Sequence, residues 1–238
     1  MSIYLLGGAL LLLLGLILLG KPRRFYFIRH GETLLNAQHI KQGAEGALSP
    51  LGREQAKQVG MYLKHRFIEA IISSPYPRAQ ETSHIIQGRI SAPIFVSPLL
   101  AERRNPTELI GKSTKSPEVE AIVDKIELAY HDDDYRYSDE ENFADLKTRA
   151  KKCLALLARQ GAPQTAVVTH HVILKMLLAY MLHGERLHSA DFVKLSFFNV
   201  SDNAAITVCE FHPWHLFSPT RGWKVISYNE QPETQNPA

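Results

Sequence analysis

Three short polar clusters in this sequence carry side chains that could act on a phosphate group. They are Arg29-His30-Gly31, Ser73 to Arg78, and Thr169-His170-His171. Arginine presents a rigid, permanently charged fork that matches phosphate oxygens, and a neutral imidazole is a competent nucleophile. If Arg29, Arg78, His30 and His170 converge, they form a phosphoryl-transfer pocket that needs no metal and no other cofactor.

The clusters can meet only if the elements before them are neighbouring strands of one sheet. Strand-like apolar runs alternate with segments whose apolar residues recur at helical spacing. Strands are expected at 25–28, 68–72, 94–96, 165–169, 205–211 and 223–228, and helices at 49–65 (with Phe67 extending its apolar stripe), 78–86, from 116, 142–160 and 172–182. This alternation predicts an α/β fold, a three-layer sandwich around a mostly parallel central sheet. In such sheets the active site lies beyond the carboxyl ends of the strands, where all three clusters fall.

Composition excludes several other classes of protein. The 238 residues are 45% hydrophobic and 21% charged, which is typical of a globular protein and not of a disordered one. The formal charge of +3 gives no reason to expect nucleic acid as a partner. The two cysteines, Cys153 and Cys209, are too few for a disulfide framework and lack zinc-ligand spacing.

Further motifs lie in a fixed order along the chain. Around the first cluster the sequence reads Ile28-Arg-His-Gly-Glu-Thr33 with Asn36 after it; then come Gln42-Gly43, Leu48 to Ala56, Ser73 to Thr82, Leu100-Ala-Glu102, Glu141 eight residues before Arg149, and Val168-Thr-His170. From Phe25 to about Tyr228 this series resembles the histidine phosphatase (phosphoglycerate mutase-like) superfamily. Asn142 stands where many members of that family have serine, and His171 where glycine is common.

The resemblance implies a role for each matched residue. His30 would attack phosphorus and carry a transient phosphohistidine, while Glu102 would protonate the leaving oxygen and then activate water. The phosphoryl oxygens would be held by Arg29, Arg78, Asn36 and His170. It also implies one catalytic domain, residues 25–228, with a cap insertion at 103–140. The last ten residues, 229–238, are polar and contain proline, so a flexible tail is expected there.

Other groups of potentially reactive residues have simpler explanations. Cys153 and Arg159 have the spacing of a tyrosine phosphatase motif, but Cys153 shares the apolar face of a helix and is expected in the core. The pair His212 and His215 has metal-ligand spacing without a companion ligand, so a loop is expected. The segment 131–134, with three aspartates, is expected to be a solvated loop.

Within the resembled family the sequence favours a phosphatase. The mutases have a longer motif after the acid, and only Glu102-Arg103 of it is present here. The expected reaction is therefore phosphomonoester hydrolysis on a small phosphorylated substrate, with mutase-type transfer as the first alternative. The second alternative, an inactive membrane-tethered interaction module, is disfavoured because the nucleophile, acid and arginines are all retained. The substrate's identity and the oligomeric state stay open.

The N-terminal segment differs from the rest of the chain. Residues 3–19 contain no charge and ten leucines, and the cations Lys21, Arg23 and Arg24 follow directly. A helix of that length reaches about 26 Å, slightly less than a hydrocarbon core of about 30 Å. We expect a single-pass membrane anchor at residues 3–20, and the positive-inside rule places the catalytic domain in the cytoplasm.

Overall fold

The computed structural model describes residues 20–129, 132–195, 201–215, 220 and 222–232. The strands are β1 (Arg23–Arg29), β2 (Ala70–Ser73), β3 (Ile94–Val96), β4 (Gln164–Thr169), β5 (Ile206–Phe211) and β6 (Trp223–Glu230). The helices are α2 (Leu34–Ala37), α3 (Pro50–Leu63), α4 (Pro77–Ile90), α5 (Pro117–Leu128), α6 (Phe143–Leu157), α7 (His171–His183) and α8 (Ser189–Lys194). Short 3₁₀ turns include η1 (Pro98–Leu100), η2 (Thr107–Leu109), η3 (Gly184–Arg186) and η5 (Pro213–His215).

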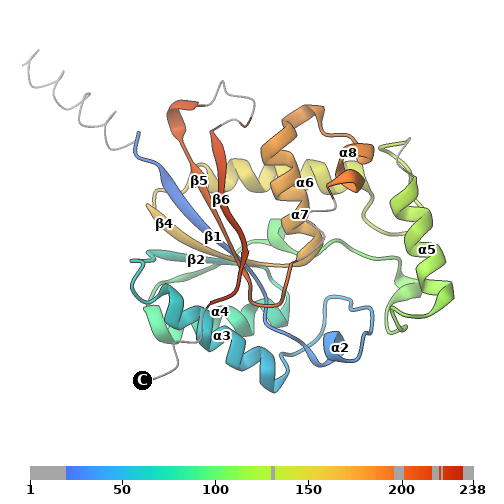
Figure 1. The fold of residues 1–238 in the computed structure, drawn as a ribbon, viewed down its shortest axis with the longest axis horizontal. Helices are drawn as coiled ribbons and strands as arrows, with labels where there is room; N and C mark the ends of the chain where they lie inside the picture. The colour runs from blue at the N-terminus through green and yellow to red at the C-terminus, as the bar shows by residue number, and fades with distance from the viewer. Residues whose placement is uncertain (1–19, 130–131, 196–200, 216–219, 221, 233–238) are drawn as a thin grey trace, which may run out of the picture.

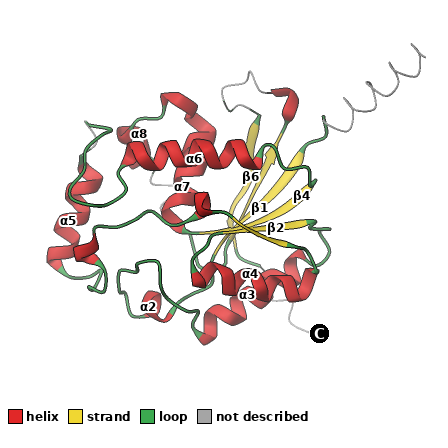
Figure 2. Ribbon diagram, turned by 180° about the vertical axis from the view of Figure 1, so that it is seen from behind, coloured by secondary structure: helices red, strands yellow, loops and turns green. Residues whose placement is uncertain are grey.

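The six strands form one sheet in the order β3-β2-β4-β1-β5-β6. β1, β2, β3 and β4 run parallel, whereas β5 is antiparallel to both of its neighbours. Helices α3 and α4 cover one face of the sheet, and α6 and α7 cover the other (Figure 1 and, from behind, Figure 2). The predicted α/β sandwich with a mostly parallel sheet is confirmed.

β1 shows why the sheet must be covered on both sides. Phe25 and Phe27 are fully buried in the cluster that α6 and α7 complete, while Tyr26 and Ile28 are buried in the cluster that α3 and α4 complete. Because successive side chains of a strand point to opposite faces, four consecutive apolar residues need two packed layers. The central position of β1 follows from this continuous apolar run.

The structure corrects several boundaries. α3 ends at Leu63, so Phe67 does not extend its buried stripe: it has a left-handed φ of 48° and is 83% exposed. The short helices α2 and α8 were not predicted, because four and six residues are too few to show a helical period. β6 continues to Glu230, two residues into the predicted tail.

The predicted membrane anchor lies almost wholly outside the described residues. Among the residues that the structure describes, no helix is long and apolar enough to cross a bilayer.

The segment predicted as a cap has a small hydrophobic core that is separate from the two cores of the sheet. Leu109 and the α5 residues Val119 and Ile122 form this buried cluster. In Figure 1, α5 stands apart from the sheet and its covering helices.

Candidate active site

The three predicted clusters meet at the carboxyl ends of β1, β2 and β4. The backbone N–H of His30 donates to the carbonyl of Thr169 at 3.0 Å, and that of Ser74 donates to Val168 at 2.9 Å. These hydrogen bonds continue the strand pairing by one residue beyond each strand. They place the side chains that follow the strands at one point, as the parallel topology requires.

Arg78, in the first turn of α4, joins the two histidines. Its Nε lies 3.2 Å from Nε2 of His30 and 3.3 Å from Nδ1 of His170. All three side chains are buried. The other end of the guanidinium donates to three successive backbone carbonyls, those of residues 43–45, at 3.0–3.1 Å. The loop at Gln42-Gly43 therefore sets the orientation of Arg78.

The hydrogen bonds of His30 fix its tautomer. Its Nδ1 lies 2.7 Å from the carbonyl oxygen of Gly31, which can only accept, so Nδ1 carries the proton. Nε2 then carries the lone pair and faces Arg78. The ring is held in the form in which Nε2 can act as a nucleophile.

His170 is oriented by Ser74, whose hydroxyl lies 2.7 Å from its Nε2. A hydroxyl can donate or accept, so Ser74 supports His170 in either tautomer. The two imidazole rings are 5.0 Å apart, and Tyr76 packs edge-on against His170 at 5.1 Å.

Burial holds the pKa of both histidines well below the ordinary value. For His30, the positive charges of Arg78 and Arg29 lower the pKa further. For His170 the same arginines, together with His30, act in the same direction. Because a buried cation beside other cations is unfavourable, both rings are neutral at neutral pH.

Arg29 and Asn36 line the same cavity as His30. One terminal nitrogen of Arg29 donates to the carbonyl of Ser201, and its buried Nε has no hydrogen-bond partner among the described residues. The side-chain oxygen of Asn36 accepts from the backbone N–H of Thr33 at 3.3 Å, which directs its NH₂ group away from Thr33.

Glu102 lies at the amino end of α7. Its carboxylate accepts hydrogen bonds from the backbone N–H groups of Arg103 (2.8 Å), Val172 (3.2 Å) and Ile173 (3.2 Å). The first turn of a helix offers free N–H groups and a positive dipole end, so it holds a carboxylate well. The side chain is thereby fixed beside His171, the first residue of α7.

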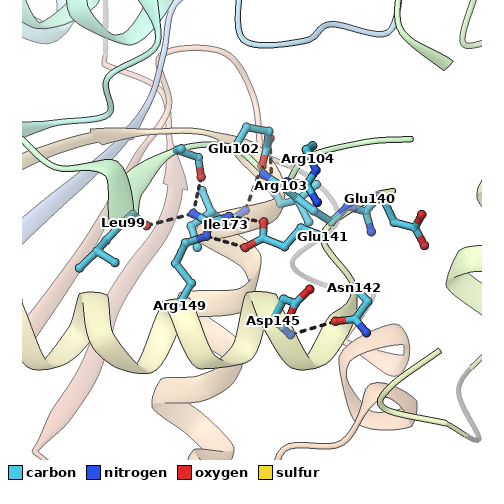
Figure 3. Close-up of polar contacts among 12 residues, drawn as sticks. Leu99, Glu102, Arg103, Arg104, Glu140, Glu141, Asn142, Asp145, Arg149 and Ile173 are labelled. Carbon is cyan, nitrogen blue, oxygen red and sulfur yellow. Dashed lines mark hydrogen bonds and ion pairs between the residues drawn. The ribbon is translucent and has the colours of Figure 1, made fainter. Parts of the chain in front are cut away.

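A buried arginine supports the segment that carries Glu102. Arg149 of α6 grips both oxygens of Glu141 at 2.6 and 2.5 Å, and donates to the carbonyls of Leu99 (3.0 Å) and Ala101 (2.6 Å). Figure 3 shows Arg149 rising from α6 between Glu141 and the segment leading to Glu102. This bidentate pair is only 16% and 15% exposed, so it is screened little by water.

Two glycines allow the turn after His30 to pass close to α3. A Cβ on Gly31 would lie 2.4 Å from the carbonyl oxygen of Gly52, and one on Gly52 would lie 2.0 Å from that of Glu32. Gly31 also donates its N–H to Thr82 of α4 at 3.1 Å. The nucleophile's turn is thus packed against both helices.

The cavity over this site has a volume of about 450 Å³. Besides the phosphate-directed residues, its lining includes the cations Lys41, Arg103 and Lys175, and the aromatic rings of Phe143 and Phe192. Burial lowers the pKa of both lysines, as does the charge of Arg103, while Glu127 of α5 opposes the shift. The cavity lining also includes the acids Glu127 and Asp132, so beyond the phosphate end the cavity has cationic, acidic and apolar side chains.

The structure brings together all six residues that the sequence singled out: Arg29, His30 and Arg78 with His170, and, on the same cavity, Asn36 and Glu102. Sequence reasoning missed the supporting residues Asn203, which donates to the His30 carbonyl at 3.1 Å, and Lys175 and Phe192 in the cavity wall. Asn203 follows no recognisable motif, and the other two depend on how α7 and α8 pack.

The other candidates have structural roles or lie apart. Cys153 is fully buried in α6, as expected. Asp133, predicted to lie in a solvated loop, also accepts a hydrogen bond of 2.7 Å from the backbone N–H of Ser189 at the start of α8. Within the described ranges, no group of three or more His, Cys, Asp or Glu side chains could hold a metal ion.

The histidine phosphatase superfamily (branch 1) model matches residues 25–220. A probable phosphoglycerate mutase of Escherichia fergusonii is 31% identical over 160 residues, covering 66% of this chain and 74% of that protein. A broad-specificity phosphatase of Saccharomyces cerevisiae is 25% identical over 185 residues, covering 75% of this chain and 76% of that protein. The fold is similar to that of a mycobacterial glucosyl-3-phosphoglycerate phosphatase, with a TM-score of 0.71, 24% identity and coverage of 88% of this chain and 99% of that one.

Proposed function

Because this chain belongs to the histidine phosphatase superfamily, we propose that it hydrolyses phosphomonoesters through a phosphohistidine on His30. The proposal is carried by the two contacts of the His30 ring. The hydrogen bond from Nδ1 to the Gly31 carbonyl leaves the lone pair on Nε2, and Nε2 faces the guanidinium of Arg78. A neutral imidazole nitrogen beside a fixed positive charge can attack a phosphate that the same charge holds in place.

The reaction has two balanced steps. In the first, Nε2 of His30 bonds to phosphorus, the bond from phosphorus to the ester oxygen breaks, and Glu102 gives its proton to the leaving alkoxide. In the second, Glu102 takes a proton from water as the water oxygen attacks phosphorus, the N–P bond breaks, and phosphate leaves. Arg29, Arg78 and His170 hold the phosphoryl oxygens, and Asn36 adds a neutral hydrogen bond.

The test is replacement of the nucleophile. His30→Ala should abolish hydrolysis of p-nitrophenyl phosphate and should prevent acid-labile, alkali-stable labelling by a phosphorylated substrate, with an unchanged circular dichroism spectrum. His84→Ala, an exposed histidine of α4, is the matched control and should keep full activity. Turnover in a folded His30→Ala variant would contradict the whole mechanism.

Mutase-type transfer is the second candidate because the curated relative at 31% identity is a probable phosphoglycerate mutase. This reaction uses the same phosphohistidine, but its phosphoryl group is transferred to a second hydroxyl of the substrate instead of to water. Incubation with 3-phosphoglycerate separates the two: release of inorganic phosphate indicates hydrolysis, and formation of 2-phosphoglycerate indicates transfer. An inactive interaction module would do neither.

The charges that line the cavity beyond the phosphate end indicate a class of substrate. Three cations, Lys41, Arg103 and Lys175, outnumber the two acids Glu127 and Asp132, which favours a phosphomonoester with a second acidic group, such as a carboxylate or another phosphate. A panel of phosphorylated metabolites, with singly and doubly anionic members matched in size, tests this preference through kcat/KM.

We also propose that the leucine-rich segment 3–20 tethers the catalytic domain to a membrane from the cytoplasmic side. The uncharged run and the one-sided cations at Lys21, Arg23 and Arg24 support it. Carbonate extraction should leave the protein in the membrane, and protease added to intact cells or spheroplasts should not digest the domain. Release into the soluble fraction would contradict the tether, and digestion from outside would contradict the orientation.

A further inference from the structure

The edge of the sheet opposite the active site carries an unusual surface, here called the amino edge. It consists of the described residues that lead into β1, β2, β3 and β4, those that follow β5 and those that begin β6, which lie along one side of the molecule (Figures 1 and 2). Its described segments are residues 20–24, 64–69, 88–93, 159–163, 210–215 and 222–224. Backbone hydrogen bonds from Glu69 to Gln164 and from Arg24 to Pro163 join neighbouring segments.

Charge is distributed unevenly between this edge and the rest of the chain. The amino edge holds eight cations and only two acids; the cations are Lys21, Arg23, Arg24, Lys64, Arg66, Arg89, Arg159 and Lys224, and the acids are Glu69 and Glu210. Its formal charge of +6 exceeds the +3 of the whole chain, so the remainder of the protein is net negative. One of the two acids, Glu210, pairs with Arg24 at 2.6 Å.

Two aromatic side chains stand out from the same edge. Phe67 is 83% exposed and Trp214 is 59% exposed. Phe67 sits at the left-handed φ of 48°, which a bulky residue adopts only when the chain around it requires that conformation. Exposed aromatic rings among lysines and arginines are the side chains that favour the boundary between lipid headgroups and water.

We propose that the amino edge rests on the surface of an anionic lipid bilayer, with Phe67 and Trp214 in the headgroup region and the cations facing acidic lipids. Positive charge complements the negative surface of a cytoplasmic leaflet, and this attraction acts within about 10 Å at moderate salt. Nucleic acid is the other polyanion that a basic surface could bind. A bilayer is favoured because the uncharged run of residues 3–19 adjoins this edge directly, at Gly20.

The structure supplies an intrinsic probe. Trp214 is exposed, whereas Trp223, the other tryptophan, is buried at 5% exposure. In the full-length protein reconstituted into vesicles containing phosphatidylglycerol, brominated lipid should quench Trp214 fluorescence and acrylamide should quench it weakly. Trp214→Phe removes the probe and should abolish lipid quenching, while Trp223 reports that the core is intact.

Charge-reversal variants test the electrostatic attraction between the amino edge and acidic lipids. Lys64→Glu and Arg159→Glu should reduce lipid quenching of Trp214 several-fold, as should vesicles of phosphatidylcholine alone. Lys115→Glu, an equal charge change at an exposed residue of the predicted cap, is the matched control and should have no effect. Hydrolysis of p-nitrophenyl phosphate should be unchanged in all these variants, so the result is independent of the proposed reaction.

Several outcomes would overturn the proposal. They are full acrylamide access to Trp214 in acidic vesicles, equal quenching with and without acidic lipid, and failure of the full-length protein to associate with such vesicles. Protection of Trp214 by RNA or DNA but not by vesicles would assign the surface to nucleic acid instead.

Discussion

At the scale of single residues, the reactivity proposed for His30 depends on two neighbours with opposite functions. The carbonyl of Gly31 holds the proton on Nδ1, and the guanidinium of Arg78 together with burial keeps a second proton off Nε2. The arginine proposed to hold the phosphate therefore also keeps the proposed nucleophile in its neutral form. This second role would distinguish Arg78 from a side chain that only binds substrate.

The depressed pKa of His30 sets the expected pH dependence. A histidine at the ordinary value of 6.5 would lose its lone pair to a proton below that pH, whereas His30 stays neutral well below it. The acid limb of kcat/KM for p-nitrophenyl phosphate should therefore lie below pH 6.5.

Arg78→Gln should move that acid limb toward higher pH, because a positive charge that lowers the pKa is lost. It should also reduce kcat/KM by about 10²- to 10³-fold, through loss of a donor to the phosphoryl oxygens. The substrate titrates in the same way in assays of the unmodified protein and of Arg78→Gln. The difference between the two pH profiles of kcat/KM therefore reports on the protein. An acid limb that stays in place or moves to lower pH in Arg78→Gln would contradict this account.

In the proposed mechanism two arginines take the place that a metal ion has in many other phosphatases. Arg29 and Arg78 would neutralise the phosphate, and the proposed steps use only protein side chains. Activity should therefore survive prolonged treatment with EDTA, measured as kcat/KM before and after dialysis. Loss on chelation with recovery on adding Mg²⁺ or Zn²⁺ would point to a metal-assisted reaction.

At the scale of secondary-structure elements, α6 supports the segment that carries the proposed acid, Glu102. Its Arg149 holds the carbonyls of Leu99 and Ala101 and so sets where the next residue, Glu102, lies. Arg149 is a positioning residue, and its loss should affect the proton that Glu102 delivers more than it affects phosphate binding.

Arg149→Met should therefore lower kcat for an alkyl phosphate, a poor leaving group that needs the proton, by about tenfold or more. It should change kcat for p-nitrophenyl phosphate, a good leaving group, far less. Lys151→Met, at an exposed ion pair on the same helix, is the control and should leave both rates unchanged. An equal fall for both substrates would indicate general loss of structure instead.

The contact between the His30 turn and α3 makes a prediction about stability. Gly52→Ala places a methyl group against the carbonyl of Glu32, and the backbone must move to relieve the overlap. We expect a loss of about 1–3 kcal/mol in the free energy of unfolding, measured with urea, together with reduced activity. Gly88→Ala on α4, where a Cβ meets nothing within 4 Å, should instead stabilise the protein by up to about 1 kcal/mol. Equal effects of the two substitutions would contradict the close approach.

How far the sequence predicts the structure differs between these elements. Strand 25–28 is apolar at consecutive residues and ends at the polar cluster Arg29-His30-Gly31, so both the strand and the site at its end can be predicted from the sequence. Phe67 shows where periodicity fails: its spacing continues the stripe of α3, but the helix ends at Leu63 and the ring is exposed. The hydrogen bond from Asn203 to His30 and those from Arg149 to Leu99 and Ala101 are long-range contacts that no local sequence pattern predicts.

At the scale of the whole molecule, the fold places the two proposed functions at opposite ends of one sheet. The carboxyl ends hold the phosphate-directed residues, and the amino ends hold the basic, aromatic surface proposed to meet lipid. β1 connects the two ends most directly, because it runs from Arg23 to Arg29 with His30 immediately after it.

In the proposed orientation on a bilayer, the length of β1 limits which phosphate groups His30 can reach. Seven residues of extended strand span about 23 Å. With the amino edge against a bilayer, the headgroup phosphates of that bilayer would lie a full strand length from His30, beyond the opposite end of the sheet. Phospholipids in the same membrane are then sterically excluded as substrates, and every ester hydrolysed must arrive by diffusion from the aqueous side.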